Sequence, residues 1–244
     1  GGGEMELEMI SYVNFNKIKK AKNKFFQGMS DNTCIGFLLA TLCNKASIYA
    51  SNFTTFGMKK WHKSLLDNFN FLCGKQVPQL SFKKMEVESF RKEKGYELLG
   101  FNLTQKTKPK ILTKDSEIKV SGRIIGGNLD ILSHLCGTKF DNVKNYIKQY
   151  KNDGIIWFFE SCDLNILEQC RCIWKLKNAG WFENAKAFLI GRPLNSEDMF
   201  DCNYKECNLE HLKDLNVPVV IDLDIGHIAP TWFIVNGAIA NFEM

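Results

Sequence analysis

The chain has 244 residues, of which 45% are hydrophobic and 24% are charged, with a formal net charge of +5 at pH 7. This composition is typical of globular proteins, and the length allows one large domain or two small ones. No run of about 18 apolar residues is present, so we expect no membrane span. The densest basic stretch, 17–24, alternates lysines with Ala and Asn and lacks interleaved aromatic or arginine residues. It indicates a solvated helix face, and we expect no nucleic-acid partner.

The first third of the chain predicts a helix, a short strand and a second helix. Residues 31–43 follow a polar cap region and predict a buried helix, 47–49 a short strand, and 61–71 a helix with apolar residues at helical spacing. Residues from about 76 to 116 are rich in lysine and weakly periodic, which indicates a connector with some extended structure. We therefore predict an N-terminal domain over 1–75, a linker over 76–117 and a C-terminal domain over 118–244.

Three short apolar runs mark the C-terminal domain, at 154–159, 185–190 and 217–221. Runs of this length, rich in β-branched and aromatic residues, are typical of strands buried on both faces. A helix is predicted between the first two runs (164–180) and a shorter one before the third (209–215). Alternating strands and helices predict an α/β fold with a largely parallel sheet.

Polar groups follow each of these strands. Glu160 ends the first, Arg192 follows the second, and the third leads through Asp224 to His227. Functional groups gather at the carboxyl ends of parallel strands, so Glu160 and His227 are candidates for the orienting acid and the general base of a hydrolase. The alternative is structural: a strand-end glutamate often caps the next helix, and a single histidine is often a structural residue.

A glycine turn precedes a helix at 126–129. Glycines before a helix N-terminus let the backbone approach a ligand and expose free amides. Close packing between layers explains two adjacent glycines equally well.

The nine cysteines are an odd number and lie within apolar stretches rather than in a regular framework. We therefore expect buried, reduced thiols and a cytoplasmic location. One cluster needs a test for metal binding, because it combines cysteines with a histidine: Cys170, Cys172, Cys202, Cys207 and His211. Its spacing is looser than the ligand pairs of zinc sites, so we predict no metal, and nothing in the sequence indicates a cofactor.

Taken in order, these motifs resemble the LD-carboxypeptidase family of serine peptidases. The matching segments are a Gly-Tyr-Ser-Asp-x-Thr-like segment at 28–33, the Gly-Gly-Asn-Leu turn at 126–129, the strand ending in glutamate at 157–160, the Ile-Gly-Arg strand end at 190–192, and Gly-His-x-x-Pro at 226–230. Residues 52–58 are similar to the microcin C self-immunity branch. The resemblance covers nearly the whole chain.

The resemblance implies an incomplete Rossmann-like N-terminal domain followed by a swivelling-type α/β domain, usually in a homodimer. It implies cleavage of an amide near a free carboxyl end, with His227 as general base and Glu160 orienting the imidazole. Gly126, Gly127 and Asn128 would bind the substrate. Family substrates include the L,D-linked D-alanine of murein tetrapeptides and aminoacyl adenylate mimics. A loop tryptophan often stacks on the nucleobase in the immunity branch, and none occurs between Trp61 and Trp157, which disfavours an adenylate.

The sequence departs from the family at the nucleophile. The family serine follows a Gly-Gly-Tyr-x turn, and the chain opens instead with glycines at 1–3, which puts Met5 or Glu6 at the serine position. Neither side chain can act as an alkoxide. Ser11 falls several residues late, and Ser30 is interpreted as the N-cap of the helix that follows.

Two explanations follow from this departure. The chain is a catalytically inactive homologue that binds a peptide-like or nucleotide-like ligand, or a residue in a missing upstream segment supplies the nucleophile. An opening glycine in place of Met leads us to expect an N-terminally truncated chain.

Overall fold

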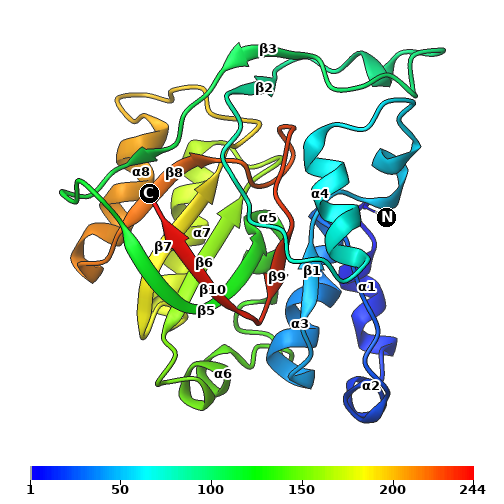
Figure 1. Ribbon diagram of the computed structural model, residues 1–244. Helices are drawn as coiled ribbons and strands as arrows, with labels where there is room; N and C mark the ends of the chain where they lie inside the picture. Colours follow the sequence, from blue (N-terminus) through cyan, green and yellow to red (C-terminus); the bar gives the residue numbers. More distant parts are fainter. Residues whose placement is uncertain (1) are drawn as a thin grey trace.

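The computed structural model describes residues 2–244 and is built around one six-stranded sheet (Figure 1). Its strand order is β10-β5-β6-β7-β8-β4, with β5 to β8 parallel and the two edge strands antiparallel. This confirms the predicted α/β class and the largely parallel layer. The strands are β4 (Lys110–Ile111), β5 (Lys119–Asn128), β6 (Ile155–Glu160), β7 (Ala185–Gly191), β8 (Val219–Leu223) and β10 (Ile239–Glu243).

The central strands β6, β7 and β8 coincide with the three predicted apolar runs. All six residues of β6 are buried, and alternate side chains enter different cores. Trp157 and Phe159 pack against the helices, whereas Ile156 and Phe158 pack into a second core on the opposite face. A strand enclosed on both faces has no solvent side, which is why its sequence is continuously apolar.

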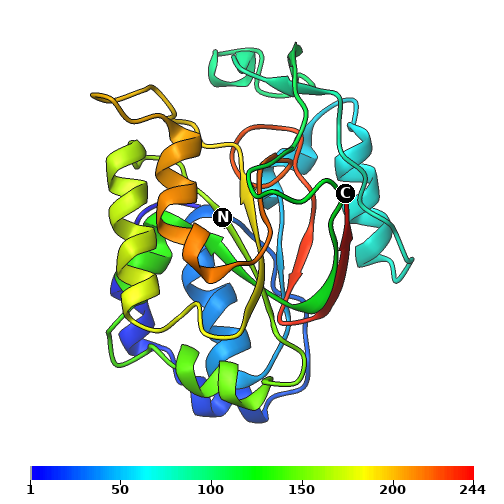
Figure 2. The same ribbon diagram turned by 90° about the vertical axis from the view of Figure 1, so that its left-hand side faces the viewer.

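Helices cover one face of the sheet. They are α5 (Leu129–Leu135), α6 (Val143–Gln149), α7 (Ile166–Asn178) and α8 (Tyr204–Leu212). Figure 2 shows α7 and α8 side by side on this face. The start of α7 is determined locally, because the Asn165 side chain accepts from the backbone N–H of Glu168 while the Glu168 carboxylate accepts from the N–H of Asn165. The predicted helices 164–180 and 209–215 are confirmed, and the second begins earlier, at Tyr204.

The N-terminal part packs against the helix-covered core. It contains α1 (Glu6–Met9), α2 (Phe15–Lys20), α3 (Thr33–Cys43), β1 (Ser47–Tyr49) and α4 (Lys63–Leu72). The last three agree with the predicted elements, whereas α1 was not predicted. Ten of the 11 residues of α3 are buried, and Phe37 stacks on Trp181 at 5.2 Å between ring centroids. β1 pairs in antiparallel fashion with β9 (Ile234–Asn236). The lysines of 17–24 are exposed, as predicted.

The predicted linker 76–117 contains more ordered structure than expected. β2 (Lys84–Glu86) and β3 (Leu103–Lys106) form an antiparallel pair, and β4 joins the edge of the central sheet beside β8. The remaining short helical turns are Ile10–Tyr12, Ser30–Asn32, Phe53–Gly57, Phe90–Lys92 and Lys213–Leu215.

Gly126 is required by the contact between β5 and β6. A Cβ at this position would lie 1.7 Å from the carbonyl oxygen of Phe158, which is backbone and cannot move aside. We expect Gly126→Ala to lower the free energy of unfolding by about 3 kcal/mol or more. Gly100→Ala is the control, because its Cβ would lie an ordinary 3.6 Å from the nearest backbone atom. Urea unfolding checks this, and equal midpoints for the two variants would contradict it.

Candidate active site

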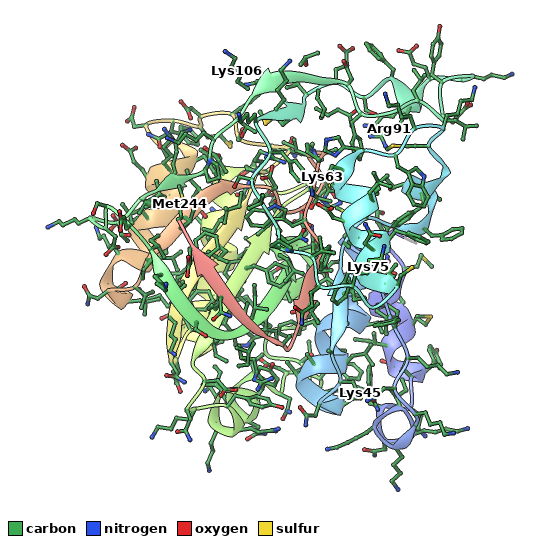
Figure 3. All side chains as sticks on the ribbon, viewed as in Figure 1. Lys45, Lys63, Lys75, Arg91, Lys106 and Met244 are labelled. Carbon is green, nitrogen blue, oxygen red and sulfur yellow. A yellow bond between two sulfur atoms is a disulfide. The ribbon has the colours of Figure 1, made fainter. Side chains whose placement is uncertain are left out.

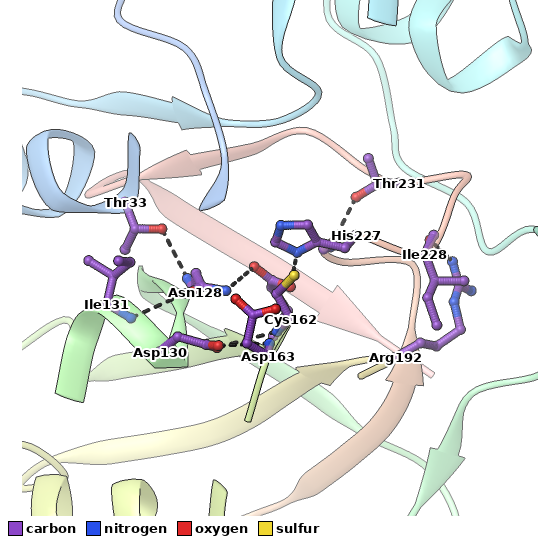
Figure 4. A network of polar contacts seen from close by, with 12 residues as sticks. Thr33, Asn128, Asp130, Ile131, Cys162, Asp163, Arg192, His227, Ile228 and Thr231 are labelled. Carbon is purple, nitrogen blue, oxygen red and sulfur yellow. Dashed lines mark hydrogen bonds and ion pairs between the residues drawn. The ribbon is translucent and has the colours of Figure 1, made fainter. Parts of the chain in front are cut away.

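Glu160 lies at the carboxyl end of β6 and its side chain is buried, with the residue 1% exposed. One carboxylate oxygen, Oε1, accepts hydrogen bonds from Asn128 Nδ2 at 3.0 Å and from the hydroxyl of Tyr49. The other, Oε2, lies 2.7 Å from Nδ1 of His227. The two residues predicted as acid and base are therefore in direct contact, although 67 positions separate them in the chain (Figure 4).

His227 is carried by the loop after β8. Gly226 precedes it at a φ of +100°, and a Cβ there would lie 2.5 Å from Glu160 Oε2, so glycine is needed for the close approach. The N–H of Gly226 donates to Thr231 Oγ1 at 3.2 Å. Because Nδ1 is held by the carboxylate, Nε2 is left at the opposite edge of the imidazole ring for other chemistry.

A buried ion pair holds the same loop from the other side. Arg192, which follows β7, donates to Asp224 Oδ1 at 2.5 Å, and the two side chains are 4% and 1% exposed. The guanidinium also donates to the carbonyl oxygens of Ile228 and Pro230, at 2.9 and 2.8 Å. The first strand end thus contacts His227 itself, and Arg192 and Asp224 hold the loop that carries it, with Arg192 beside Ile228 in Figure 4.

The charges of the pair perturb both pKa values. Burial raises the pKa of Glu160, but the charge of His227 and the hydrogen bonds from His227, Tyr49 and Asn128 outweigh it and lower the pKa below its usual value. Burial lowers the pKa of His227, but the Glu160 carboxylate and the contact with Cys162 raise it above its usual value. The ionised carboxylate and the imidazolium therefore stabilise each other.

Tyr49 and Thr33 are members of this network that sequence reasoning did not identify. Burial and the neighbouring Glu160 raise the pKa of the Tyr49 phenol well above its usual value, so it remains a donor to the carboxylate. Thr33 Oγ1 accepts from the backbone N–H of Asn128 at 3.0 Å. Both belong to the N-terminal part. Nothing in the sequence around them indicates a contact with residues 111 and 95 positions further along the chain.

A cavity of about 320 Å³ opens beside His227. Its wall combines polar side chains with one aromatic ring and one arginine, and it includes residues from both parts of the chain. The lining residues are Gly2, Met29, Ser30, Ser51, Asn52, Thr54, Thr55, Arg91, Phe101, Gly226, His227, Ala229 and Thr231.

The three predicted substrate-binding residues have structural contacts. The backbone of Gly126 exchanges two 3.0 Å hydrogen bonds with the Asn236 side chain, and a Cβ on Gly127 would lie 2.5 Å from Thr33 Cγ2. Asn128 Oδ1 caps α5, while its Nδ2 donates to Glu160. Among the described residues that line the cavity, none of the three is found. Substrate binding by them stays a prediction.

The N-terminal turn, at the predicted nucleophile position, is occupied by a carboxylate. Gly1 lies outside the described residues. The backbone N–H groups of Met5 and Glu6 both donate to Asp31 Oδ2, at 2.9 and 3.0 Å. The Met5 side chain is exposed, and burial together with the nearby Asp31 raises the pKa of Glu6. The turn therefore binds an internal carboxylate through its amides.

The prediction of buried, reduced thiols is wrong for the disulfide pair Cys202 and Cys207 and for the exposed Cys73. Cys202 and Cys207 form a disulfide, since the start of α8 brings the thiols of this short segment together. Cys73 is exposed and Cys162 and Cys172 are partly exposed, and the other free thiols are buried, namely Cys34, Cys43, Cys136 and Cys170. Within residues 2–244, no group of three or more potential ligands is placed to hold a metal ion.

The comparison with known families agrees with this geometry. The family described as "LD-carboxypeptidase C-terminal domain" matches residues 121–242, half of the chain, and its span includes both Glu160 and His227. The chain belongs to the LD-carboxypeptidase family. A search of curated proteins found no match.

Solved structures show the LD-carboxypeptidase fold over nearly the whole chain. An MccF-like protein from Bacillus anthracis is 21% identical, with a TM-score of 0.77 over 98% of this chain and 70% of that one. Muramoyltetrapeptide carboxypeptidase from Oxalobacter formigenes is also 21% identical, with a TM-score of 0.69 over 99% and 72%. The microcin self-immunity protein MccF in complex with aspartyl sulfamoyl adenosine is 21% identical, with a TM-score of 0.74 over 100% and 73%. At these identities the likeness shows the fold, a two-domain α/β architecture.

Within residues 2–244, no helix combines the length and the apolar character that crossing a bilayer requires.

Proposed function

We propose that the protein hydrolyses an amide bond near a free carboxyl end, with His227 as general base and Glu160 as the group that orients it. The observation that carries this proposal is the 2.7 Å contact between Glu160 Oε2 and His227 Nδ1 at the wall of a polar cavity. A buried carboxylate on Nδ1 sets the tautomer and stabilises the imidazolium that forms when Nε2 takes a proton. Membership of the LD-carboxypeptidase family supports the same chemistry.

The substrate class proposed is a peptide ending in a D-amino acid, which the family resemblance implies, and one structural relative is named muramoyltetrapeptide carboxypeptidase. The second class is a peptidyl or aminoacyl adenylate, because MccF structures contain sulfamoyl adenosine compounds. Phe101 offers an aromatic face in the cavity wall for a nucleobase, although the tryptophan expected in the immunity branch is missing from 62–156.

One assay tests the function. The protein is incubated with a muramoyl tetrapeptide that ends in an L,D-linked D-alanine, and free D-alanine is measured; a parallel reaction contains an aspartyl adenylate analogue. Release of product from either substrate supports the hydrolase. If neither is cleaved but calorimetry detects binding, the protein is the inactive homologue that Met5 and Glu6 at the serine position suggest. The homodimer and the cytoplasmic location stay predictions, and sedimentation would test the first.

Arg91 is proposed to bind the free carboxylate of the substrate. It lies on the segment that joins β2 to β3 (Figure 3), lines the cavity, and stacks on Phe101 at 4.7 Å. Its Nε is buried and has no partner among residues 2–244, whereas its NH2 group pairs with Glu86 at 2.5 Å. The buried Nε cannot reach a ligand, so NH1, which is neither buried nor bonded among the described residues, is the donor suited to a substrate carboxylate in the cavity that His227 also lines.

We expect Arg91→Met to raise KM by about 10- to 100-fold with little change in kcat, because a charged hydrogen bond contributes about 1.5–3 kcal/mol. Steady-state kinetics measure both constants. The control is Arg171→Met, an exposed arginine on α7. An unchanged KM for Arg91→Met, with normal thermal unfolding, would rule out this role.

A further inference from the structure

Ser30 has a backbone conformation that serine rarely adopts. Its φ is +65°, in the left-handed region that favours glycine. Gln27, three residues before it, bridges Ile48 in parallel, and the turn Ser30–Asn32 leads directly into α3. An extended segment, a strained serine and a helix in succession form the kind of turn that exposes a nucleophile.

The strained turn is held by its neighbours. The N–H of Gly28 donates to the carbonyl of Ile48 at 3.1 Å, and the N–H of Met29 donates to Asn52 Oδ1 at 3.1 Å. Ile48 belongs to β1, and the next residue of that strand, Tyr49, donates to Glu160. These contacts fix Ser30 relative to the Glu160 network, so the backbone strain is maintained by the fold.

The Ser30 hydroxyl does not serve as the helix cap that the sequence suggested. Neither the turn Ser30–Asn32 nor α3 has a side-chain cap, which corrects the N-cap interpretation. Ser30 is instead partly exposed and lines the same cavity as His227. Ser30 and His227 therefore border one solvent-accessible space.

Other nucleophiles near the site are less well placed. At the N-terminal turn, Met5 and Glu6 bring no hydroxyl or thiol, and their amides already bind Asp31. Cys162 contacts the imidazole of His227, but it is not among the described residues that line the cavity (Figure 4). Ser161 is 3% exposed, so a substrate cannot reach it without a rearrangement.

We propose that Ser30 is the nucleophile of this chain and forms a Ser30–His227–Glu160 triad in a position different from the family's serine turn. This inference rests on the proposed hydrolase function. His227 Nε2 takes the Ser30 Oγ proton as Oγ bonds to the carbonyl carbon, and the imidazolium then protonates the leaving amine as the C–N bond breaks. Water, deprotonated by His227, cleaves the acyl-serine ester, and the proton returns to Ser30.

Two measurements test the proposal. The protein is treated with a fluorophosphonate probe, and the modified residue is located by peptide mass spectrometry. We expect one adduct, on Ser30, that is absent from Ser30→Ala and from Ser30→Gly. The glycine variant removes the hydroxyl while suiting a φ of +65°, so its loss of labelling cannot come from backbone strain. Ser11→Ala, an exposed serine outside the cavity, is the matched control and should label normally.

The hydrolysis assay separates this proposal from the function on which it rests. We expect both Ser30 variants to lose at least about 10³-fold in kcat. Wild-type rates in Ser30→Gly, or an adduct on Ser161 or Cys162, would overturn the assignment of Ser30 and leave the hydrolase intact. If the wild type cleaves neither substrate, the hydrolase fails, and the assignment then depends on the probe: an adduct on Ser30 supports a reactive serine, and no adduct refutes it.

Discussion

Replacing His227 with alanine is expected to lower kcat for amide hydrolysis by at least about 10³-fold while the protein stays folded. The imidazole is held by Glu160 through Nδ1, so Nε2 is the group placed to exchange protons with the nucleophile and the leaving amine. Without it, neither proton transfer has an acceptor or a donor. Single-turnover assays with the muramoyl tetrapeptide measure the loss.

The control for this variant is His134→Ala, which removes an exposed histidine from α5. It should retain the wild-type rate. Circular dichroism and thermal unfolding establish that His227→Ala is folded. Activity that survives in His227→Ala would disprove the assignment of the base, and with it the triad that includes Ser30.

Replacing Glu160 with glutamine is expected to lower kcat by about 10²- to 10⁴-fold and to move the pH dependence. The base must be neutral to take a proton, and the Glu160 carboxylate raises the pKa of His227. The wild-type rate should therefore continue to increase with pH beyond about 6.5, the usual pKa of histidine. In Glu160→Gln the negative charge is gone while burial still lowers the pKa of His227, so the rising limb should move to lower pH.

The pH dependence of stability should reflect the titration of the same two groups, Glu160 and His227. The pKa of Glu160 is lowered on folding, so its contribution is present above the usual value of 4.5 and is lost as the pH falls through the folded pKa. The pKa of His227 is raised on folding, so its contribution is present below 6.5 and is lost as the pH rises through the folded pKa. The unfolding temperatures of wild type and Glu160→Gln should differ most between pH 4.5 and pH 6.5, where both contributions are present, and should converge at lower pH.

The control for the pH experiments is Glu197→Gln, an exposed glutamate after β7. It should leave the pH–rate profile and the unfolding temperature unchanged. A rising limb in Glu160→Gln at the wild-type pH would show that the carboxylate does not govern the titration of His227.

The central sheet was predictable because its strands are enclosed on both faces. Runs such as 155–159 have no polar alternation, and only a strand between two layers buries such a segment completely. The helix α7 carries its own start signal, the capping box of Asn165 and Glu168. The strand-end positions of Glu160 and His227 followed from the same parallel order, since polar residues directly after buried strands converge at one edge.

The supporting contacts were not predictable in this way. Tyr49 reaches Glu160 across 111 positions, and Asp31 binds the amides of a segment 25 and 26 positions before it. Hydrogen bonds between residues so far apart in the sequence depend on how separate elements pack. A single residue in a short polar segment shows no hydrophobic periodicity from which that packing could be predicted. The disulfide between Cys202 and Cys207 was missed because composition suggested reduced thiols, whereas the start of α8 decides their geometry.

The sequence by itself determined the α/β class, the order of the central strands along the chain, the family likeness, and Glu160 and His227 as candidate acid and base. Only the tertiary structure decided that these two side chains meet, that Asp31 occupies the turn where the family serine is expected, and that Ser30 lies in a left-handed conformation beside the same cavity as His227. The physical reason is that burial and periodicity are local properties of a segment. The position of a nucleophile relative to its base depends on the packing of elements far apart in the chain.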